Sequence, residues 1–201
     1  MSLPEGVERR TVDGERVLAT RGPDGDWREW DPRRSKLGAM LDRGVETGLG
    51  GGETVLYLGA AAGTTVSHVA DLAGPVYAVE FAPRPMRDLL EVAAARELVI
   101  PLLKDARRPA TYGHVVEPVD VIVQDVATRG QARVAIENRR FLAPDGRLLL
   151  AIKARSEDVT AAPEAVFESV LEDLSSAYEV LATERLDPLH EAHLGVVARP
   201  A

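Results

Sequence analysis

The sequence contains no cysteine, four histidines and only three lysines among its 201 residues. Without cysteine there is no disulfide framework and no thiolate metal site, and the histidines lack the spacing of a zinc site. No apolar run approaches the roughly 20 residues that span a bilayer, and the segment MSLPEGVERR lacks the apolar core of a signal peptide. We therefore expect a cytoplasmic protein that binds no metal and no membrane.

Acidic residues outnumber basic ones, so the formal net charge is -8 at pH 7. This balance argues against binding nucleic acid through an extended basic surface, because clustered Lys and Arg drive phosphate binding. Scarce lysine beside abundant Asp and Glu is typical of a GC-rich genome or a salt-rich cytoplasm, and it draws attention to Lys36, Lys104 and Lys153. The apolar fraction of 45% is enough to fill the core of one main domain.

The first part of the chain has the signals of a small β structure. A turn at Asp13-Gly14 between two runs of strand-forming residues predicts a hairpin over residues 6–20. The segment GPDGDWREWDPRRS that follows is rich in turn residues, and Trp27 and Trp30 in it are expected to pack against the N-terminal sheet. From Lys36 the apolar residues have helical spacing. We place a boundary near Asp31, with an N-terminal β-hairpin subdomain at 1–31 and a main domain at 32–201.

The main domain alternates apolar strand-like runs with helical stretches. Runs such as VDVIVQD and GRLLLAIK are typical of parallel strands buried on both faces, and the segments between them suit crossover helices. This pattern predicts an α/β fold with a doubly wound, mostly parallel, seven-stranded Rossmann-like sheet. A Pro-Asp-Gly turn is expected before the strand at 147–153, and the last two strands lack a helix between them and should pair antiparallel. The expected strands are 54–59, 75–81, 97–102, 119–124, 147–153, 178–185 and 193–199.

A glycine turn follows the first of these strands, in TVLYLGAAAGTT at 54–65. Ala61 stands where a dinucleotide fingerprint has its second glycine, and the turn lacks the Gly-Lys-Ser/Thr of a phosphate loop. Glu80 and Asp105 follow later strands, where a carboxylate can accept ribose hydroxyls or an adenine amino group. The pattern favours S-adenosylmethionine, which has no phosphate to cradle. A nicotinamide-dependent oxidoreductase remains the alternative.

Several longer segments of the sequence together resemble a known family. REWDPRRSKLGAM, VLYLGAAAGTTVSHVADLAGPVYAVEF, DAR, VDVIVQDVA, LLLAIKARSEDVTA and EAHLGVVARP occur in order over residues 27 to 200. Together they resemble archaeal-type fibrillarin, the RNA ribose 2′-O-methyltransferase of box C/D guide particles. The resemblance implies a methyltransferase sheet, S-adenosyl-L-methionine as cofactor, and rRNA and tRNA as targets. It also implies three partners: a box C/D guide RNA, a Nop-domain scaffold protein and a kink-turn-binding ribosomal-type protein.

The resemblance also assigns site residues. The expected cofactor contacts are Gly59, Thr64, Thr65, Glu80, Phe81, Asp105, Ala106, Asp125, Val126, Ala127, Thr128 and Gln131. The family commonly has glutamine where this chain has Thr128, and serine where it has Ala62. The expected catalytic set is Lys36, Asp125, Lys153 and His193.

The resemblance gives each catalytic residue a role. Lys153 would stabilise the developing alkoxide, Asp125 would hold Lys153 and orient the hydroxyl, Lys36 would place the phosphate or ribose, and His193 would complete the network. Arg33-Arg34, Arg107-Arg108 and Arg139-Arg140 are candidates for local RNA contacts. A non-catalytic subunit of an RNA particle and a small-molecule O-methyltransferase remain alternatives.

Overall fold

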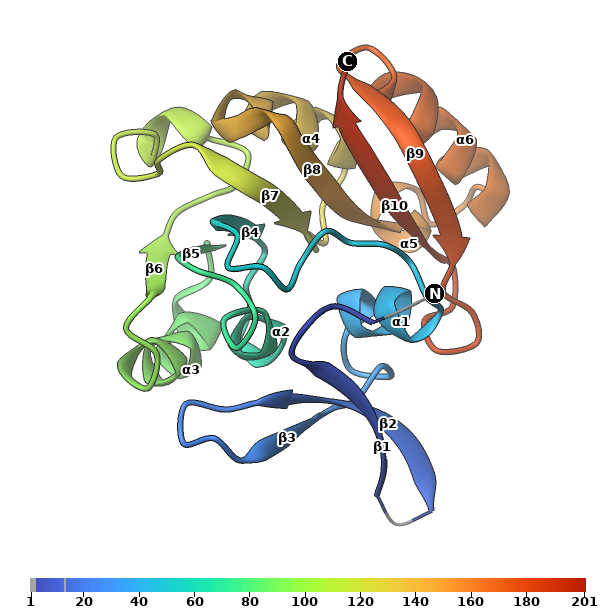
Figure 1. Ribbon diagram of the computed structural model, residues 1–201. Coiled ribbons are helices and arrows are strands. Elements are labelled where there is room, and N and C mark those ends of the chain that lie inside the picture. The colour runs from blue at the N-terminus through green and yellow to red at the C-terminus, as the bar shows by residue number, and fades with distance from the viewer. Residues whose placement is uncertain (1–2, 13) are drawn as a thin grey trace.

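The computed structural model describes residues 3–12 and 14–201, which form two β-sheets and several helices (Figure 1). The strands are β1 (Val7–Val12), β2 (Glu15–Arg21), β3 (Trp27–Trp30), β4 (Val55–Leu58), β5 (Val76–Glu80), β6 (Val99–Leu103), β7 (Val119–Gln124), β8 (Leu142–Lys153), β9 (Tyr178–Arg185) and β10 (His193–Pro200). The helices are α1 (Lys36–Asp42), α2 (Thr64–Val69), α3 (Pro83–Ala94), α4 (Gln131–Asn138), α5 (Ala154–Glu157) and α6 (Pro163–Leu174), with short 3-10 turns at η1 (Pro109–Thr111) and η2 (Arg139–Phe141).

The larger sheet has seven strands in the order β6-β5-β4-β7-β8-β10-β9. Strands β4 to β8 are parallel, whereas β10 runs antiparallel to both β8 and β9. The chain moves outward from β4 through β5 and β6 and then returns to β7 on the other side of β4. This reversal is a topological switch point, where doubly wound sheets bind ligands at the carboxyl ends of their strands. The predicted fold class and the antiparallel final pair are confirmed.

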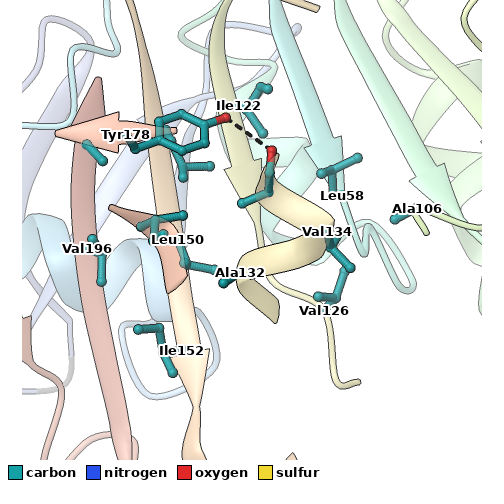
Figure 2. Packing of buried hydrophobic residues seen from close by; sticks show 14 of the residues in the cluster. Leu58, Ala106, Ile122, Val126, Ala132, Val134, Leu150, Ile152, Tyr178 and Val196 are labelled. Carbon is teal, nitrogen blue, oxygen red and sulfur yellow. Dashed lines mark hydrogen bonds between the residues drawn. The ribbon is translucent and has the colours of Figure 1, made fainter. Parts of the chain in front are cut away.

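The inner strands of this sheet are buried on both faces because their apolar side chains alternate between two clusters. Leu56, Leu58 and Ile122 face the cluster that α4 and α6 cover, which Figure 2 shows from close by. Val55 and Tyr57 face the opposite cluster, which contains residues of α1, α2, α3 and the smaller sheet. The result is a sheet between two helical layers, as continuous apolar strands require.

The smaller sheet has the order β1-β2-β3 and contains one strand that the sequence did not predict. The hairpin is confirmed by antiparallel pairing of β1 with β2 that ends at Val12 and Glu15, although Asp13 of the expected turn lies outside the described residues. β3 lies in the segment GPDGDWREWDPRRS, whose many turn residues predict no strand. In it the Trp27 ring stacks under the guanidinium groups of Arg10 and Arg21, at 4.9 and 4.8 Å from the ring centre. Cross-strand packing thus outweighs the local turn propensity.

The smaller sheet packs against the main domain through α2 (Figure 1). The ring of Trp30, 1% exposed, stacks on His68 of α2 with centroids 5.0 Å apart and an interplanar angle of 4°. Asp71, just after α2, accepts hydrogen bonds from Arg28 of β3 and from Arg96. The two sheets therefore contribute to one continuous core. The division at residue 31 stays a prediction.

β8 begins five residues earlier than the run expected at 147–153. Its pairing with β7 steps from Val119 opposite Leu142 to Val121 opposite Arg147, so several residues of β8 have no partner on β7 at this point. The Pro-Asp-Gly segment lies in that gap. The expected turn is thus an irregularity inside a long strand. β8 extends back beyond it to Leu142, which pairs with Val119 of β7.

Candidate active site

A cavity of about 350 Å³ opens at the carboxyl ends of the central strands. It lies at the switch point, where chain segments that follow β4, β5, β6 and β7 meet the last residue of β8. Its lining residues are Gly59, Ala61, Val79, Glu80, Phe81, Lys104, Asp105, Ala106, Arg107, Asp125, Val126, Ala127, Thr128, Val134 and Lys153.

The turn after β4 requires glycine for two reasons. Gly59 has φ +86°, and a Cβ atom at this position would lie 2.7 Å from the backbone oxygen of Asp125. The glycine therefore lets the first turn approach the end of β7 closely. Ala61 follows with φ 48°, and its N–H donates to Oε2 of Glu80 at 2.9 Å. This hydrogen bond joins the turn to the last residue of β5.

Glu80 is held on both carboxylate oxygens by backbone donors. Its Oε1 accepts from Ala82 N at 2.7 Å, beside the contact of Oε2 with Ala61. The side chain is 6% exposed. A carboxylate oxygen has two lone-pair sites, so each oxygen can accept one more hydrogen bond from a ligand. Phe81 beside it is 68% exposed and presents an aromatic ring to the cavity.

Two lysine ammonium groups converge on Asp125, the residue that follows β7. Nζ of Lys153 lies 2.8 Å and Nζ of Lys36 lies 3.5 Å from Oδ1 of Asp125. This oxygen is shielded from solvent and meets both cations as ion pairs. Nζ of Lys153 also donates to the backbone oxygen of Asp125 at 3.0 Å. Two of the three lysines in the chain therefore share one carboxylate.

Burial lowers the pKa of Lys153 below its ordinary value of 10.5. Asp125 opposes this shift because it favours the ammonium form, whereas the charge of Lys36 adds to it. His193 is the register partner of Lys153 on β10. Burial also lowers the pKa of His193 from 6.5, with smaller contributions from Lys36, His190 and Lys153. The imidazole is therefore neutral near pH 7.

The tautomer of His193 follows from one contact. Its Nδ1 lies 2.7 Å from the backbone oxygen of Glu191, which can only accept, so Nδ1 carries the proton. In the neutral ring Nε2 is then an acceptor. Lys36, Asp125, Lys153 and His193 are thus brought together from four elements or their ends, and the set combines cations, a carboxylate and a neutral imidazole.

Comparison with known proteins places this chain in a family. The family model described as Fibrillarin matches residues 5–201. The chain belongs to the fibrillarin family. It is 70% identical to the fibrillarin-like rRNA/tRNA 2'-O-methyltransferase of Haloarcula marismortui, over 100% of this chain and 99% of that protein.

Two solved fibrillarin structures share the fold closely. Aeropyrum pernix fibrillarin in complex with natively bound S-adenosyl-L-methionine is 39% identical, with a TM-score of 0.88 over 98% of this chain and 96% of that one. A chain of a fibrillarin/Nop5p complex is 40% identical, with a TM-score of 0.91 over 100% of both chains.

The site also contains two basic residues that the sequence did not indicate as part of it, Lys104 and Arg107. Arg107 donates from Nε and from its terminal nitrogen to the two oxygens of Asp105, at distances between 2.7 and 3.1 Å. This hydrogen bonding lowers the pKa of Asp105. The scarcity of lysine was a signal for Lys104, and the motif DAR was a signal for Arg107.

Three of the expected cofactor contacts do not line this cavity: Thr64, Thr65 and Gln131. Thr65 is 8% exposed and donates to Oγ of Ser35 at 3.1 Å, so it ties α2 to the start of α1. Thr64 lines a separate hollow beside Trp30 and Ser35. Gln131 is fully buried. The nine other expected contacts, Thr128 included, line the cavity, and all twelve assignments stay predictions.

Within the described ranges, no group of three or more His, Asp or Glu side chains is arranged to hold a metal ion. The helices of the same ranges include none that is both long and apolar enough to cross a membrane.

Proposed function

We propose that this chain is an S-adenosylmethionine-dependent RNA ribose 2′-O-methyltransferase that acts on rRNA and tRNA under the direction of a box C/D guide RNA. The observation that carries the proposal is the convergence of Lys36 and Lys153 on Asp125. A cationic group beside a carboxylate is suited to an acceptor oxygen that gains negative charge as its hydroxyl proton leaves during attack on the methyl group.

The residues of the cavity fit S-adenosylmethionine. Glu80 can accept from the two hydroxyls of a ribose, and Ala106 and Val126 offer apolar surface for a base. The carboxylate of Asp125 suits a cationic sulfonium. When bound, the cofactor supplies an electrophilic methyl group on that sulfonium. The Aeropyrum pernix fibrillarin structure, which contains natively bound S-adenosyl-L-methionine, supports the same assignment.

The chain's own residues would act mainly by position and charge. Lys153 would donate toward the 2′-oxygen of the target and stabilise the negative charge that develops there. Asp125 would hold the ammonium of Lys153 and help align the hydroxyl for attack. Lys36 would bind the neighbouring phosphate or ribose. His193, with Nε2 free to accept in the neutral ring, would complete the hydrogen-bond network around the acceptor.

A nicotinamide-dependent oxidoreductase has less support. Its second glycine would let a backbone N–H approach a pyrophosphate, whereas here the N–H of Ala61 is donated to Glu80. A non-catalytic subunit would have no need of the clustered Lys36, Asp125, Lys153 and His193. A small-molecule O-methyltransferase is disfavoured because two cations beside the acceptor suit a polyanionic substrate.

The proposed partners follow from charge and from the named complex. Because the net charge of -8 gives the chain little electrostatic attraction for RNA, a Nop-domain scaffold protein and a kink-turn-binding ribosomal-type protein would supply most of the RNA-binding affinity. The fibrillarin/Nop5p complex supports the first of these partners. The guide RNA would select the target nucleotide by base pairing.

Ribose-methylation mapping of cellular rRNA and tRNA tests this proposal. Cells that lack the protein should lose 2′-O-methyl groups at guide-matched positions, and expression of the chain should restore them. A Lys153→Ala chain expressed at the same level should not. An unchanged methylation map would refute the proposal.

A further inference from the structure

The backbone of Lys153 needs a partner from outside the sheet. β8 ends at this residue, and Ala154 N donates to Ala192 O at 3.1 Å. In an antiparallel ladder this bond turns the N–H and C=O of the preceding residue away from β10. On the other side β7 has already ended, since its last residue Gln124 pairs with Leu150. Two backbone groups at the edge of the active site are thus left for another partner.

Gln131, the first residue of α4, is that partner. Its Oε1 accepts from Lys153 N at 2.9 Å, and its Nε2 donates to Lys153 O at 3.1 Å, as a neighbouring strand would do. The two contacts also decide the orientation of the amide, because the reverse orientation would place its NH₂ group against the N–H of Lys153. The side chain is fully buried.

Glu157 of α5 uses the remaining hydrogen of this amide. Nε2 of Gln131 donates to Oε2 of Glu157 at 3.1 Å. Oε1 of Glu157 accepts from the backbone N–H groups of Gly130 and Gln131, at 2.9 and 3.2 Å. Both amide hydrogens of Gln131 are therefore engaged within the protein. Neither of these two hydrogens is left to donate to a cofactor.

We propose that Gln131, braced by Glu157, is a positioning residue that fixes Lys153 for methyl transfer. The proposal rests on the proposed function. Lys153 reaches Asp125 from a backbone that Gln131 anchors, so loss of the anchor moves Nζ relative to both Asp125 and the acceptor oxygen. A misplacement of 1 Å at a reacting centre can lower the rate about a hundredfold. Cofactor affinity is unaffected because the amide does not contact the cavity.

The test uses Gln131→Met, which keeps an unbranched side chain of similar length and removes the hydrogen bonds. The variant is assembled with the Nop-domain protein, the kink-turn-binding protein, guide RNA and target RNA. We expect kcat to fall about tenfold to a hundredfold. The Kd for S-adenosylmethionine, measured by calorimetry, should stay within about twofold.

Tyr178→Phe is the matched control. The Tyr178 hydroxyl donates to Ala135 O at 3.1 Å, so the variant also removes a buried hydrogen bond to α4 (Figure 2). It has no bond to Lys153, and its kcat should match the original chain. If both variants lose kcat equally, the effect is a general loosening of α4 and the proposal is overturned.

A double-mutant cycle separates positioning from other roles. On a Lys153→Met background, Gln131→Met should cause no further loss in single-turnover rate, because its effect passes through Lys153. A further loss there, an unchanged kcat in the single variant, or an equal loss of cofactor affinity would each overturn the proposal. If Gln131→Met does not fold, Glu157→Gln carries the same test, with a smaller expected fall in kcat. Absence of methyl transfer by the unsubstituted complex would instead refute the proposed function.

Discussion

At the scale of single residues, the acidic side chains of the cavity are each fixed by protein donors. Glu80 is held by two backbone N–H groups, Asp105 by Arg107, and Asp125 by Lys36 and Lys153. Glu80 and Asp105 accept charge-assisted hydrogen bonds, which are shorter and stronger than neutral ones, and Asp125 is held by two ion pairs. The carboxylates are thus in place before a ligand arrives, which lowers the cost of ordering them on binding.

Glu80 and Lys153 should separate binding from catalysis. Glu80→Ala is expected to weaken S-adenosylmethionine binding by about 2–4 kcal/mol, because two charge-supported bonds to the ribose are lost. Lys153→Ala should leave the affinity nearly intact and suppress turnover, since Lys153 acts when charge develops on the acceptor oxygen. Calorimetry and methyl-transfer kinetics measure the two effects.

Glu179→Ala is the control for these substitutions. Glu179 is an exposed residue that pairs with Arg199 on the neighbouring strand β10. Its removal should change neither affinity nor rate. Equal losses of affinity in Glu80→Ala and Lys153→Ala would contradict the division of roles.

At the scale of elements, the turn after β4 joins the cavity to the cluster of side chains around Asp125. A Cβ at position 59 would meet the backbone of Asp125, and Gly59 also has a positive φ. Gly59→Ala should therefore displace the end of β7, where the backbone oxygen of Asp125 accepts from Lys153. We expect loss of both cofactor binding and turnover.

Gly52→Ala measures the cost of a positive φ without a steric clash. Gly52 has the same φ of +86° but no atom within 4 Å of its Cβ position. The strain should cost roughly 1–2 kcal/mol in both variants, and the clash in Gly59→Ala should cost roughly 1–3 kcal/mol more. Urea unfolding gives both values. A similar stability and affinity in the two variants would refute the role of this close approach.

The contact between the smaller sheet and α2 should make stability depend on pH. Burial, with Arg28 and Arg96 nearby, lowers the pKa of His68 from 6.5 to about 3. The unfolded chain binds this proton below pH 6.5 and the folded chain does not, so the free energy of unfolding falls as pH drops from 6.5 toward 3. The slope should reach about 1.4 kcal/mol per pH unit.

His68→Asn isolates this contribution. Thr20 gives its hydroxyl hydrogen to Asp71, so His68 Nδ1 must donate to Thr20, and an asparagine amide can donate in a similar place without titrating. Urea midpoints between pH 4.5 and 7 should decline less steeply in this variant. Parallel pH profiles for the two proteins would show that His68 is not the titrating group.

The elements also show how far the sequence predicts this structure. The seven strands, α1 and the hairpin follow from apolar periodicity and turn residues, which are local signals. β3 was missed because its stability comes from packing of Trp27 and Trp30 across strands and against α2. Pairing of Gln131 with a residue 22 positions later is likewise invisible in a local pattern.

At the scale of the whole molecule, the cavity and the net charge have different consequences for binding the cofactor and for binding RNA. The cavity is formed by one chain, whereas a net charge of -8 opposes the approach of RNA. Tight RNA binding requires basic residues that neutralise phosphates, and partner proteins can supply them. We therefore expect the chain to bind its cofactor alone and to bind its RNA within an assembly.

The isolated chain should therefore bind S-adenosylmethionine yet methylate RNA feebly. Addition of the Nop-domain protein, the kink-turn-binding protein and guide RNA should raise the rate by at least an order of magnitude, through the gain in effective concentration of the target. Transfer of labelled methyl to a target RNA, with each component omitted in turn, measures this. Site-selective methylation at full rate by the chain alone would contradict the account.

The most direct test of the account replaces the target nucleotide by its 2′-deoxy counterpart in the assembled complex. In our proposal Lys36, Asp125, Lys153 and His193 act on a ribose oxygen, and a guide-paired strand exposes its 2′-hydroxyls in the shallow minor groove. Transfer of labelled methyl to the deoxy substrate should be abolished, while a deoxy substitution at the next nucleotide should leave transfer intact. Label entering the deoxy nucleotide would contradict the ribose assignment and the roles of all four residues.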